Sequence, residues 1–188
     1  MATTTKSCQE AQHVDLSKDY FSNFGFTVAY QIDLAALADQ HRQLQQIYHP
    51  DRFVAGTDAE QRIAVQTASY LNQAYAVLRS PLGRAIYLLE LQGMEPLAPT
   101  NTSMPMDFLL QQMQLRERME DIPQAADVET ELDALADELQ AMHKQLQADF
   151  AVAYLAQQLP AAEVIVRKLQ FIDKLQQECN DLEGRLLD

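Results

Sequence analysis

Tryptophan is absent from the sequence of 188 residues, and glycine is scarce, with only five. Alanine, leucine and glutamine are abundant instead, and hydrophobic residues make up 47% of the chain. This composition favours helices over sheets and provides enough apolar residues for a core. We therefore expect an all-α protein of one or two small domains.

Long apolar runs are also missing. No stretch approaches the roughly 18–20 apolar residues of a membrane span. The start of the chain has no hydrophobic region of a secretory signal, and it contains Glu10 and Asp15 but little arginine, unlike a mitochondrial transit peptide. We therefore expect a soluble, cytoplasmic protein in which residues 1–17 form a flexible tail.

Cysteine is too rare for a disulfide framework. Cys8 and Cys179 are far apart in sequence, which favours a reducing compartment. No group of Cys and His has the spacing of zinc ligands, and Cys8 with His13 would supply only two ligands from the expected tail. We expect Cys179 to be a core residue and His143 to be solvated or locally bonded, and we predict no metal or other cofactor.

Basic residues are few: the sequence has 14 of them against 27 acidic residues, and its net charge is −13. Nucleic acids and anionic membranes bind positive surfaces, so neither is an expected partner. The charge is uneven: residues 17–93 are nearly neutral, whereas residues 101–188 contain seven basic and seventeen acidic residues. Two halves with different surfaces suggest two partners, although an acidic solvated face would have the same composition.

Two amphipathic helices of similar length are predicted in the first half. Apolar side chains recur every three or four residues over 34–48 and again after a capping box formed by Thr57 and Glu60. The two stripes consist of Leu34, Leu37, His41, Leu44 and Tyr48, and of Ala64, Ala68, Leu71, Tyr75 and Leu78. A connection of about eight residues predicts an antiparallel hairpin. A short helix over 82–92 is expected to follow.

Three prolines within 94–105 mark a predicted linker. Beyond it, helical patterns cover about 106–121 and 125–158, and a third begins at Pro160. Three amphipathic helices with tight breaks predict a three-helix bundle with left-handed packing. The predicted organisation is thus a tail, a hairpin domain, a linker and a bundle, over residues 1–17, 18–93, 94–105 and 106–188.

The connection of the predicted hairpin contains the sequence QIYHPDRF, residues 46–53. His49 next to Asp51 would suit acid–base chemistry, but the sequence offers no adjacent nucleophile and none of the motifs GxSxG, Walker A, HExxH or GxGxxG. Pro50 and Asp51 are also ordinary turn residues. The tripeptide alone is therefore compatible with a simple turn as well as with a site.

The setting of this tripeptide resembles the J-domain, the module that stimulates DnaK-type ATPase chaperones. The resemblance rests on Asp19-Tyr20-Phe21, on HPDRF, on Asn72-Gln73-Ala74-Tyr75 and on Leu78-Arg79-Ser80-Pro81. The segments PLGRAIYLLELQG, MDFLLQQMQLRERMEDI and VRKLQFIDKL extend it, because they are similar to HscB-type J-domain co-chaperones of iron–sulfur cluster assembly. The cysteine-rich zinc module of some eukaryotic relatives is missing, which indicates the bacterial type.

The resemblance implies a co-chaperone that is not itself an enzyme. Asp51 would present its carboxylate to an arginine of an HscA-like ATPase chaperone, while Pro50 fixes the loop and His49 orients it. In the family, basic residues on the preceding helix face an acidic patch of the chaperone. This sequence offers only Arg42 and Arg52 there, which weakens the expected electrostatic steering.

The predicted helix over 106–121 has apolar residues on two faces. One face carries Phe108, Leu115, Met119 and Ile122, and the opposite one carries Met106, Leu109, Leu110 and Met113. A helix at the edge of a bundle buries one stripe, so the other is expected to be an exposed patch that binds a partner. Periodicity does not decide which face is free, and a second part of the chain could cover it.

The family resemblance predicts which face of this helix is free. The positions at which HscB proteins bind the iron–sulfur scaffold protein (IscU-like) match Leu109, Leu110, Met113, Gln114, Glu117, Asp121 and Phe171, with Gln114 in place of a carboxylate. We therefore predict a co-chaperone that activates the ATPase and delivers the scaffold to it. The alternatives are a structural helical protein with an incidental HPD turn and a small enzyme. Only a co-chaperone multiplies the turnover of an added ATPase.

Overall fold

The structure is a computed structural model that describes residues 14–98 and 104–187. All regular elements within these ranges are helices, as the composition predicts. Two compact units comprise Met1–Gly83 and Arg84–Asp188, and the division falls inside α4 (Pro81–Glu90). The linker over 94–105 stays a prediction. Cys8 and His13 lie outside the described residues, and none of the described helices has the length and apolar character to cross a bilayer.

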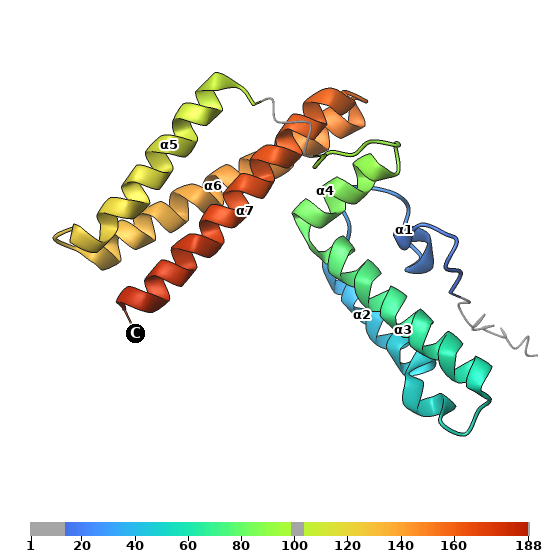
Figure 1. The fold of residues 1–188 in the computed structure, drawn as a ribbon. Coiled ribbons are helices and arrows are strands. Elements are labelled where there is room, and N and C mark those ends of the chain that lie inside the picture. The colour runs from blue at the N-terminus through green and yellow to red at the C-terminus, as the bar shows by residue number, and fades with distance from the viewer. Residues whose placement is uncertain (1–13, 99–103, 188) are drawn as a thin grey trace, which may run out of the picture. The chain divides into compact units, whose positions relative to one another are not determined.

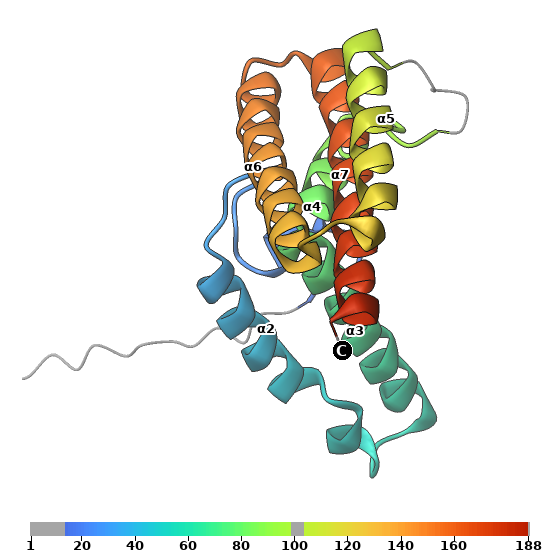
Figure 2. The ribbon, with the colours of Figure 1, turned by 90° about the vertical axis from the view of Figure 1, so that its left-hand side faces the viewer.

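The first unit is built on a hairpin of α2 (Leu34–Tyr48) and α3 (Asp58–Arg79), which lie side by side in Figures 1 and 2. The carboxylate of Asp33 begins α2 by accepting the backbone N–H groups of its first turn. Pro50 disfavours a helical conformation at His49, and α2 ends before that residue.

The two predicted stripes form the interface of the hairpin. Its buried members are Leu37, Leu44, Ala64, Ala68, Leu71 and Leu78. The alanines of α3 leave room for α2 to approach closely. At the edge of this core, the ring of His41 stacks on Tyr75 with centroids 4.1 Å apart. Leu34 departs from the predicted stripe, because 48% of its surface is exposed at the first position of α2.

A short helix that periodicity did not indicate, α1 (Tyr20–Asn23), packs against α3. Its buried Asn23 donates its side-chain amide to the hydroxyl oxygen of Tyr70 at 3.0 Å and to the backbone oxygen of Asp15 at 2.9 Å. Tyr70 in turn donates to the backbone oxygen of Lys18 at 2.8 Å. Because a buried amide must be satisfied, these bonds tie the start of the unit to α3.

The packed part of the first unit begins earlier than the expected boundary at residue 18. Val14 is only 7% exposed, and its backbone N–H donates to the hydroxyl oxygen of Tyr48 at 3.2 Å. The expected tail is therefore corrected for residues 14–17, since a buried valine and two side-chain contacts hold them against the hairpin and α1. Residues 1–13 lie outside the described part of the chain.

The second unit contains the predicted three-helix bundle. After α4 its elements are α5 (Met106–Asp121), η2 (Ile122–Gln124), α6 (Val128–Leu155) and α7 (Leu159–Leu186). Pro123 lies in the turn that follows α5, and Asp127 begins α6 by accepting the backbone N–H of Thr130 at 3.1 Å. Pro160 stands in the first turn of α7, where its missing N–H is tolerated.

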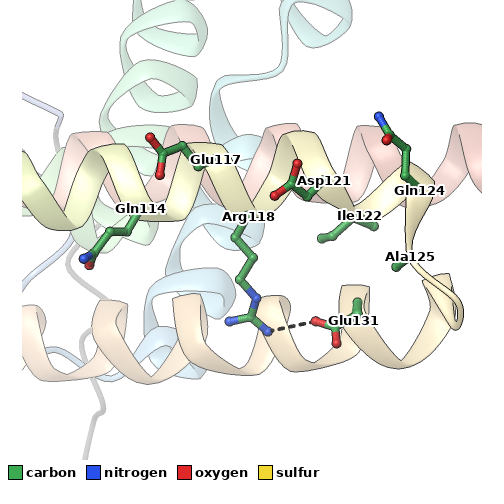
Figure 3. A pocket seen from close by; sticks show the side chains of 8 residues that line it. All are labelled: Gln114, Glu117, Arg118, Asp121, Ile122, Gln124, Ala125 and Glu131. Carbon is green, nitrogen blue, oxygen red and sulfur yellow. Dashed lines mark ion pairs between the residues drawn. The ribbon is translucent and has the colours of Figure 1, made fainter.

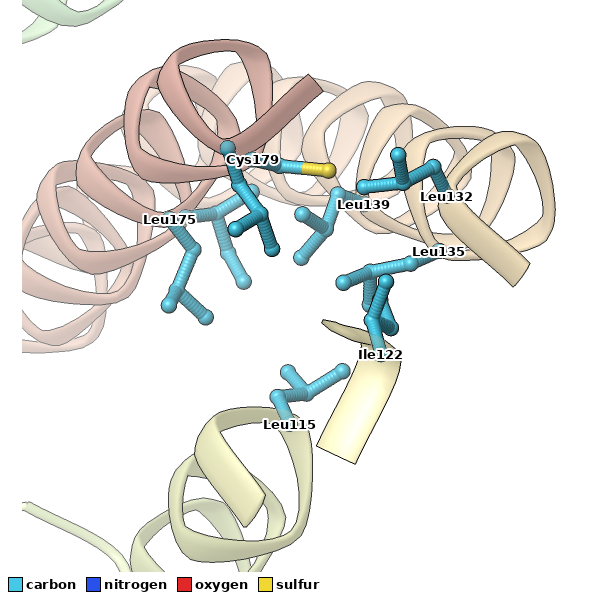
Figure 4. Close-up of a cluster of buried hydrophobic side chains, with 9 residues drawn as sticks. Leu115, Ile122, Leu132, Leu135, Leu139, Leu175 and Cys179 are labelled. Carbon is cyan, nitrogen blue, oxygen red and sulfur yellow. The ribbon is translucent and has the colours of Figure 1, made fainter. Parts of the chain in front are cut away.

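Figure 4 shows the core of this bundle, to which all three helices contribute. Its buried members are Leu115, Ile122, Leu132, Leu135, Leu139, Ile172, Leu175, Cys179 and Leu182. Cys179 is a core residue, as expected, and burial together with the negative charge of Glu183 raises the pKa of its thiol. The thiol therefore stays protonated and unreactive at neutral pH.

A substitution in this core tests the bundle. Leu135 is fully buried, so Leu135→Ala should lower the free energy of unfolding by about 2–5 kcal/mol through lost burial and the cavity left behind. Denaturant titration followed by circular dichroism measures the change. Val152, on the same helix, is 69% exposed, and Val152→Ala should shift stability by less than about 0.5 kcal/mol. Equal effects of the two substitutions would contradict this core.

Candidate functional site

The tip of the hairpin is organised by His49. Its backbone is extended, with φ −60° and ψ 128°, as expected before a proline, and it opens the short 3₁₀ helix η1 (Pro50–Phe53). The ring atom Nδ1 accepts the backbone N–H of Asp51 at 3.3 Å. An accepting Nδ1 requires the neutral ring with its hydrogen on Nε2, so the imidazole acts as a cap for η1.

Asp51 points away from the molecule. Its side chain is 85% exposed, and Oδ2 lies 3.6 Å from Nδ1 of His49, a contact that becomes an ion pair only when the histidine is protonated. With the ring neutral, the carboxylate is offered to solvent. An exposed carboxylate on a short, fixed loop can accept charge-assisted hydrogen bonds from a cation of another protein.

The two arginines expected near this loop each have a partner in the unit itself. Arg52 Nη1 donates to the backbone oxygen of Gln46 at 2.8 Å, and so satisfies a carbonyl in the last turn of α2. Arg42 pairs with Asp39 on the surface of α2. The positive charge on this side of the hairpin is thus partly balanced, in line with the sparse basic residues of the sequence.

The other end of the connection is held by the predicted capping box, which the structure confirms. The hydroxyl oxygen of Thr57 accepts the backbone N–H of Glu60 at 3.3 Å, and Glu60 Oε2 accepts the backbone N–H of Thr57 at 2.8 Å. These bonds, the backbone one first, lower the pKa of the Glu60 carboxyl. Gln61 also donates to the backbone oxygens of Val54 and Gly56, both at 3.1 Å. The loop is therefore anchored on the α3 side as well.

The structure decides which face of α5 is free. Met106, Leu109, Leu110 and Met113 are 70%, 37%, 55% and 59% exposed, and we call these four residues the outer patch. The opposite face is buried in the bundle. Within the second unit, the expectation from the family resemblance, that the face with Leu109 and Met113 is accessible, is confirmed.

The inner face of α5 explains why apolar residues remain outside. Phe108, Leu115 and Ile122 are buried and lie seven residues apart, the repeat of a left-handed helical seam. This seam is narrow, since only one residue in seven along α5 is buried in it. The apolar residues of the outer patch therefore do not take part in the packing of the bundle.

Polar side chains complete the contact of α5 with α6. Arg118 forms ion pairs with Glu138 at 2.7 Å and Glu131 at 3.5 Å, and Gln111 donates to the sulfur of Met142 at 3.8 Å. Such partly exposed ion pairs contribute about 0–1 kcal/mol each. Together with the seam they fix the rotation of α5 about its axis, and hence the direction in which the outer patch faces.

A glutamine and two acidic residues continue the outer patch along α5. Gln114, Glu117 and Asp121 follow Leu110 at intervals of four, three and four residues, so they share its face. All three are exposed and line an open groove of ≈ 570 Å³ beside Arg118 (Figure 3). One face of α5 is thus apolar over its first half and acidic over its second.

Phe171, on α7, lies against the inner seam and not on the outer patch. Its ring is half-buried and meets the edge of Phe108 with centroids 5.8 Å apart. The guanidinium of Arg116 lies 5.5 Å from the Phe171 ring and pairs with Glu178 at 3.2 Å. The expected binding residues therefore divide into an exposed row on α5 and a partly covered aromatic ring on α7.

Histidine and acidic residues in the bundle form local pairs. His143 Nε2 lies 2.8 Å from a carboxylate oxygen of Asp173, and its Nδ1 lies 3.0 Å from the side-chain amide of Gln147. The expectation that His143 is locally bonded is confirmed. Over residues 14–98 and 104–187, no three side chains of the metal-binding types gather into one site.

Known proteins resemble this chain over most of its length. Residues 104–180 match the family model of the HSCB C-terminal oligomerisation domain. The co-chaperone protein HscB homolog of Cupriavidus taiwanensis is 40% identical over 173 residues, which cover 92% of this chain and 98% of that protein. Chaperone HscB from Vibrio cholerae is 36% identical, with a TM-score of 0.82 and coverage of 90% and 99% of the two chains. Human co-chaperone protein HscB is 26% identical, with the same TM-score and coverage of 93% and 87%.

The capping box makes a prediction about the loop anchor. In a nuclear magnetic resonance titration the Glu60 carboxyl should show a pKa below the ordinary glutamate range, because its ionised form accepts the Thr57 bonds. A folded-state pKa below the unfolded value means that the contribution to stability is present at neutral pH and lost as the pH falls through the folded value. Thr57→Val should return the pKa toward the ordinary range, and an unchanged pKa would contradict a role of the hydroxyl.

Proposed function

The chain belongs to the HscB family of co-chaperones, and on this premise we propose that it stimulates the ATPase of an HscA-like, DnaK-type chaperone and delivers an IscU-like iron–sulfur scaffold protein to it. The observation that carries the proposal is the exposed carboxylate of Asp51 on a doubly anchored loop. The relatives are named co-chaperones, which fits a protein whose partner performs the hydrolysis.

The first unit supplies the contact with the chaperone. His49 and Pro50 hold the loop, so Asp51 loses little conformational freedom when an arginine of the chaperone binds it. A charge-assisted bond that excludes water is among the stronger polar contacts. By binding one conformation of the chaperone better than another, the loop shifts the conformational equilibrium that controls hydrolysis.

The approach of the two proteins depends weakly on long-range charge. Arg42 is balanced by Asp39, and Arg52 is engaged with the end of α2. Electrostatic steering requires a surplus of one sign on the approaching face. We therefore assign the specificity of this contact to the geometry of the loop, with Arg42 and Arg52 as secondary contributors.

The second unit supplies the contact with the scaffold. The outer patch provides an apolar centre, and Gln114, Glu117 and Asp121 provide a polar, largely acidic border. An apolar centre with a charged rim is the usual anatomy of a protein interface. The partner surface that fits it has apolar residues next to lysine or arginine. Phe171 adds an aromatic anchor at the α7 side.

One chain with both contacts brings scaffold and ATPase together. Tethering converts the second binding event into an intramolecular one, so the chaperone meets the scaffold at a raised effective concentration. The nearly neutral first half and strongly acidic second half of the sequence fit two partners of different charge.

The ATPase contact is tested by Asp51→Asn. Loss of the charge should lower the stimulation of the chaperone ATPase at least about tenfold, because hydrogen bonds to charged groups contribute more than neutral ones. Steady-state phosphate release by the chaperone, with and without the co-chaperone, measures this. Asp58→Asn removes an exposed charge seven residues away and should leave stimulation near the wild-type level. Full stimulation by Asp51→Asn would refute the assignment of the loop.

The scaffold contact is tested by replacing Leu109, Met113 and Phe171 with alanine. The affinity for the scaffold, measured by calorimetric titration, should fall at least about a hundredfold, as expected for the loss of several apolar anchors from one interface. Because Phe171 also packs on Phe108, a second variant changes only Leu109 and Met113 and keeps the bundle intact.

The matched control for this experiment replaces two other exposed apolar residues of the bundle, Val152 and Leu155, with alanine. This variant loses a similar apolar area outside the proposed surface and should bind the scaffold like the wild type. If the control and the outer-patch variant bind equally well, the outer patch is not the scaffold site.

A further inference from the structure

We propose that the outer patch is also an oxidation switch, in which peroxide converts Met106 and Met113 of the free protein to sulfoxides and thereby weakens the binding of the iron–sulfur scaffold protein. This inference rests on the proposed scaffold contact. It assigns to the same surface a regulation that the apolar interface alone does not imply.

The exposure of their side chains separates Met106 and Met113 from Met119 and Met142. Met106 and Met113 are 70% and 59% exposed, whereas Met119 and Met142 are partly buried and pack against the bundle core. Met142 also accepts a hydrogen bond from Gln111 at its sulfur. An oxidant in solution therefore reaches Met106 and Met113 first, since susceptibility of a thioether increases with exposure.

The positions of the two sulfurs on α5 give oxidation a functional consequence. Met106 and Met113 are seven residues apart, which is two helical turns, so they lie on the same side of the helix. Leu109 and Leu110 stand between them, at the centre of the proposed contact. Oxidation therefore alters both ends of the apolar surface that the scaffold covers.

The chemical step requires only a peroxide. The thioether sulfur attacks one oxygen of hydrogen peroxide, an S–O bond forms, the O–O bond breaks, and after proton transfer the second oxygen leaves as water. The sulfur is oxidised by two electrons and the peroxide is reduced by two. The reaction converts a flexible apolar side chain into a polar one, and methionine sulfoxide reductases reverse it.

A sulfoxide in this place disfavours binding for two reasons. Its oxygen is a strong acceptor that gives up water when the scaffold covers it, and Glu117, one turn from Met113 on the same face, has no hydrogen to donate when ionised. The patch also loses the apolar character on which the contact depends. The cost of one unsatisfied buried polar group corresponds to a loss of affinity of about tenfold or more.

Oxidation of the outer patch leaves the inner seam of α5 and the hairpin of the first unit chemically unchanged. The inner seam of α5 is buried and contains no methionine. Residues 14–83 contain no methionine either, so the hairpin with Asp51 keeps its chemistry. Oxidised protein should therefore still stimulate the chaperone ATPase in the absence of scaffold while binding the scaffold poorly.

The experiment treats the full chain with hydrogen peroxide, maps the sulfoxides by peptide mass spectrometry, and titrates the cluster-free scaffold protein by calorimetry. We expect sulfoxide at Met106 and Met113 before Met119 and Met142, and an affinity at least tenfold below that of untreated protein. Treatment with methionine sulfoxide reductases should restore the affinity, whereas their thiol reductant alone should not, which separates methionine oxidation from reversible cysteine oxidation.

Two variants sharpen the test, each compared with its own untreated form. Met106→Leu combined with Met113→Leu keeps apolar side chains that resist oxidation, so peroxide should change its affinity less than twofold. Met119→Leu combined with Met142→Leu keeps the exposed pair and should lose affinity on treatment as the wild type does.

Three results would overturn the switch: early oxidation of Met119 or Met142, unchanged affinity of wild type with both exposed methionines oxidised, or an equal loss in the Met106→Leu, Met113→Leu variant. These results are distinct from failure of the proposed function itself. If the variant with alanine at Leu109 and Met113 binds the scaffold as well as untreated wild type does, the surface is not the scaffold site, and the switch falls with it.

Discussion

The point at which α2 ends is the constraint on which the first unit depends. Pro50 disfavours a helical conformation at His49, so this residue lies outside the helix. Its imidazole accepts the backbone N–H of Asp51. Arg52 then donates to a backbone carbonyl in the last turn of α2, which satisfies one of the acceptors that the end of the helix leaves open. The Asp51 carboxylate is 85% exposed and can therefore bind another protein.

In the bundle, as in the loop, some side chains are held by internal contacts and others remain available to a partner. Phe108, Leu115 and Ile122 bury the inner side of α5, and ion pairs of Arg118 hold the helix against α6, so the four residues of the outer patch are not needed for packing. A solvent-exposed apolar stripe lowers the solubility of a protein unless a binding partner covers it. The same exposure links the proposed scaffold contact with its proposed sensitivity to peroxide, since an adaptable thioether on a binding surface is accessible to oxidants.

Several features could be predicted from the sequence because they depend on neighbours along the chain. The bounds of α2 and of α5, the capping box of Thr57 and Glu60, and the two-faced character of α5 all follow from periodicity, caps and prolines. Family resemblance added the choice of face, which burial confirms. Helix α1 escaped periodicity because four residues are too few to show it, and its stability comes from the bonds of Asn23 to groups up to 47 residues away.

The sequence by itself determined the longer helices, their order, and the loop with its histidine, proline and aspartate, and the family resemblance supplied the two partners to expect. Only the tertiary structure decided which residues are accessible: that Asp51 faces solvent, that Arg42 and Arg52 are engaged within their own unit, that Phe171 rests on Phe108, and that residues 14–17 pack. The reason is physical. Helix formation depends on residues three or four positions apart, whereas exposure and pairing depend on side chains that only folding brings together.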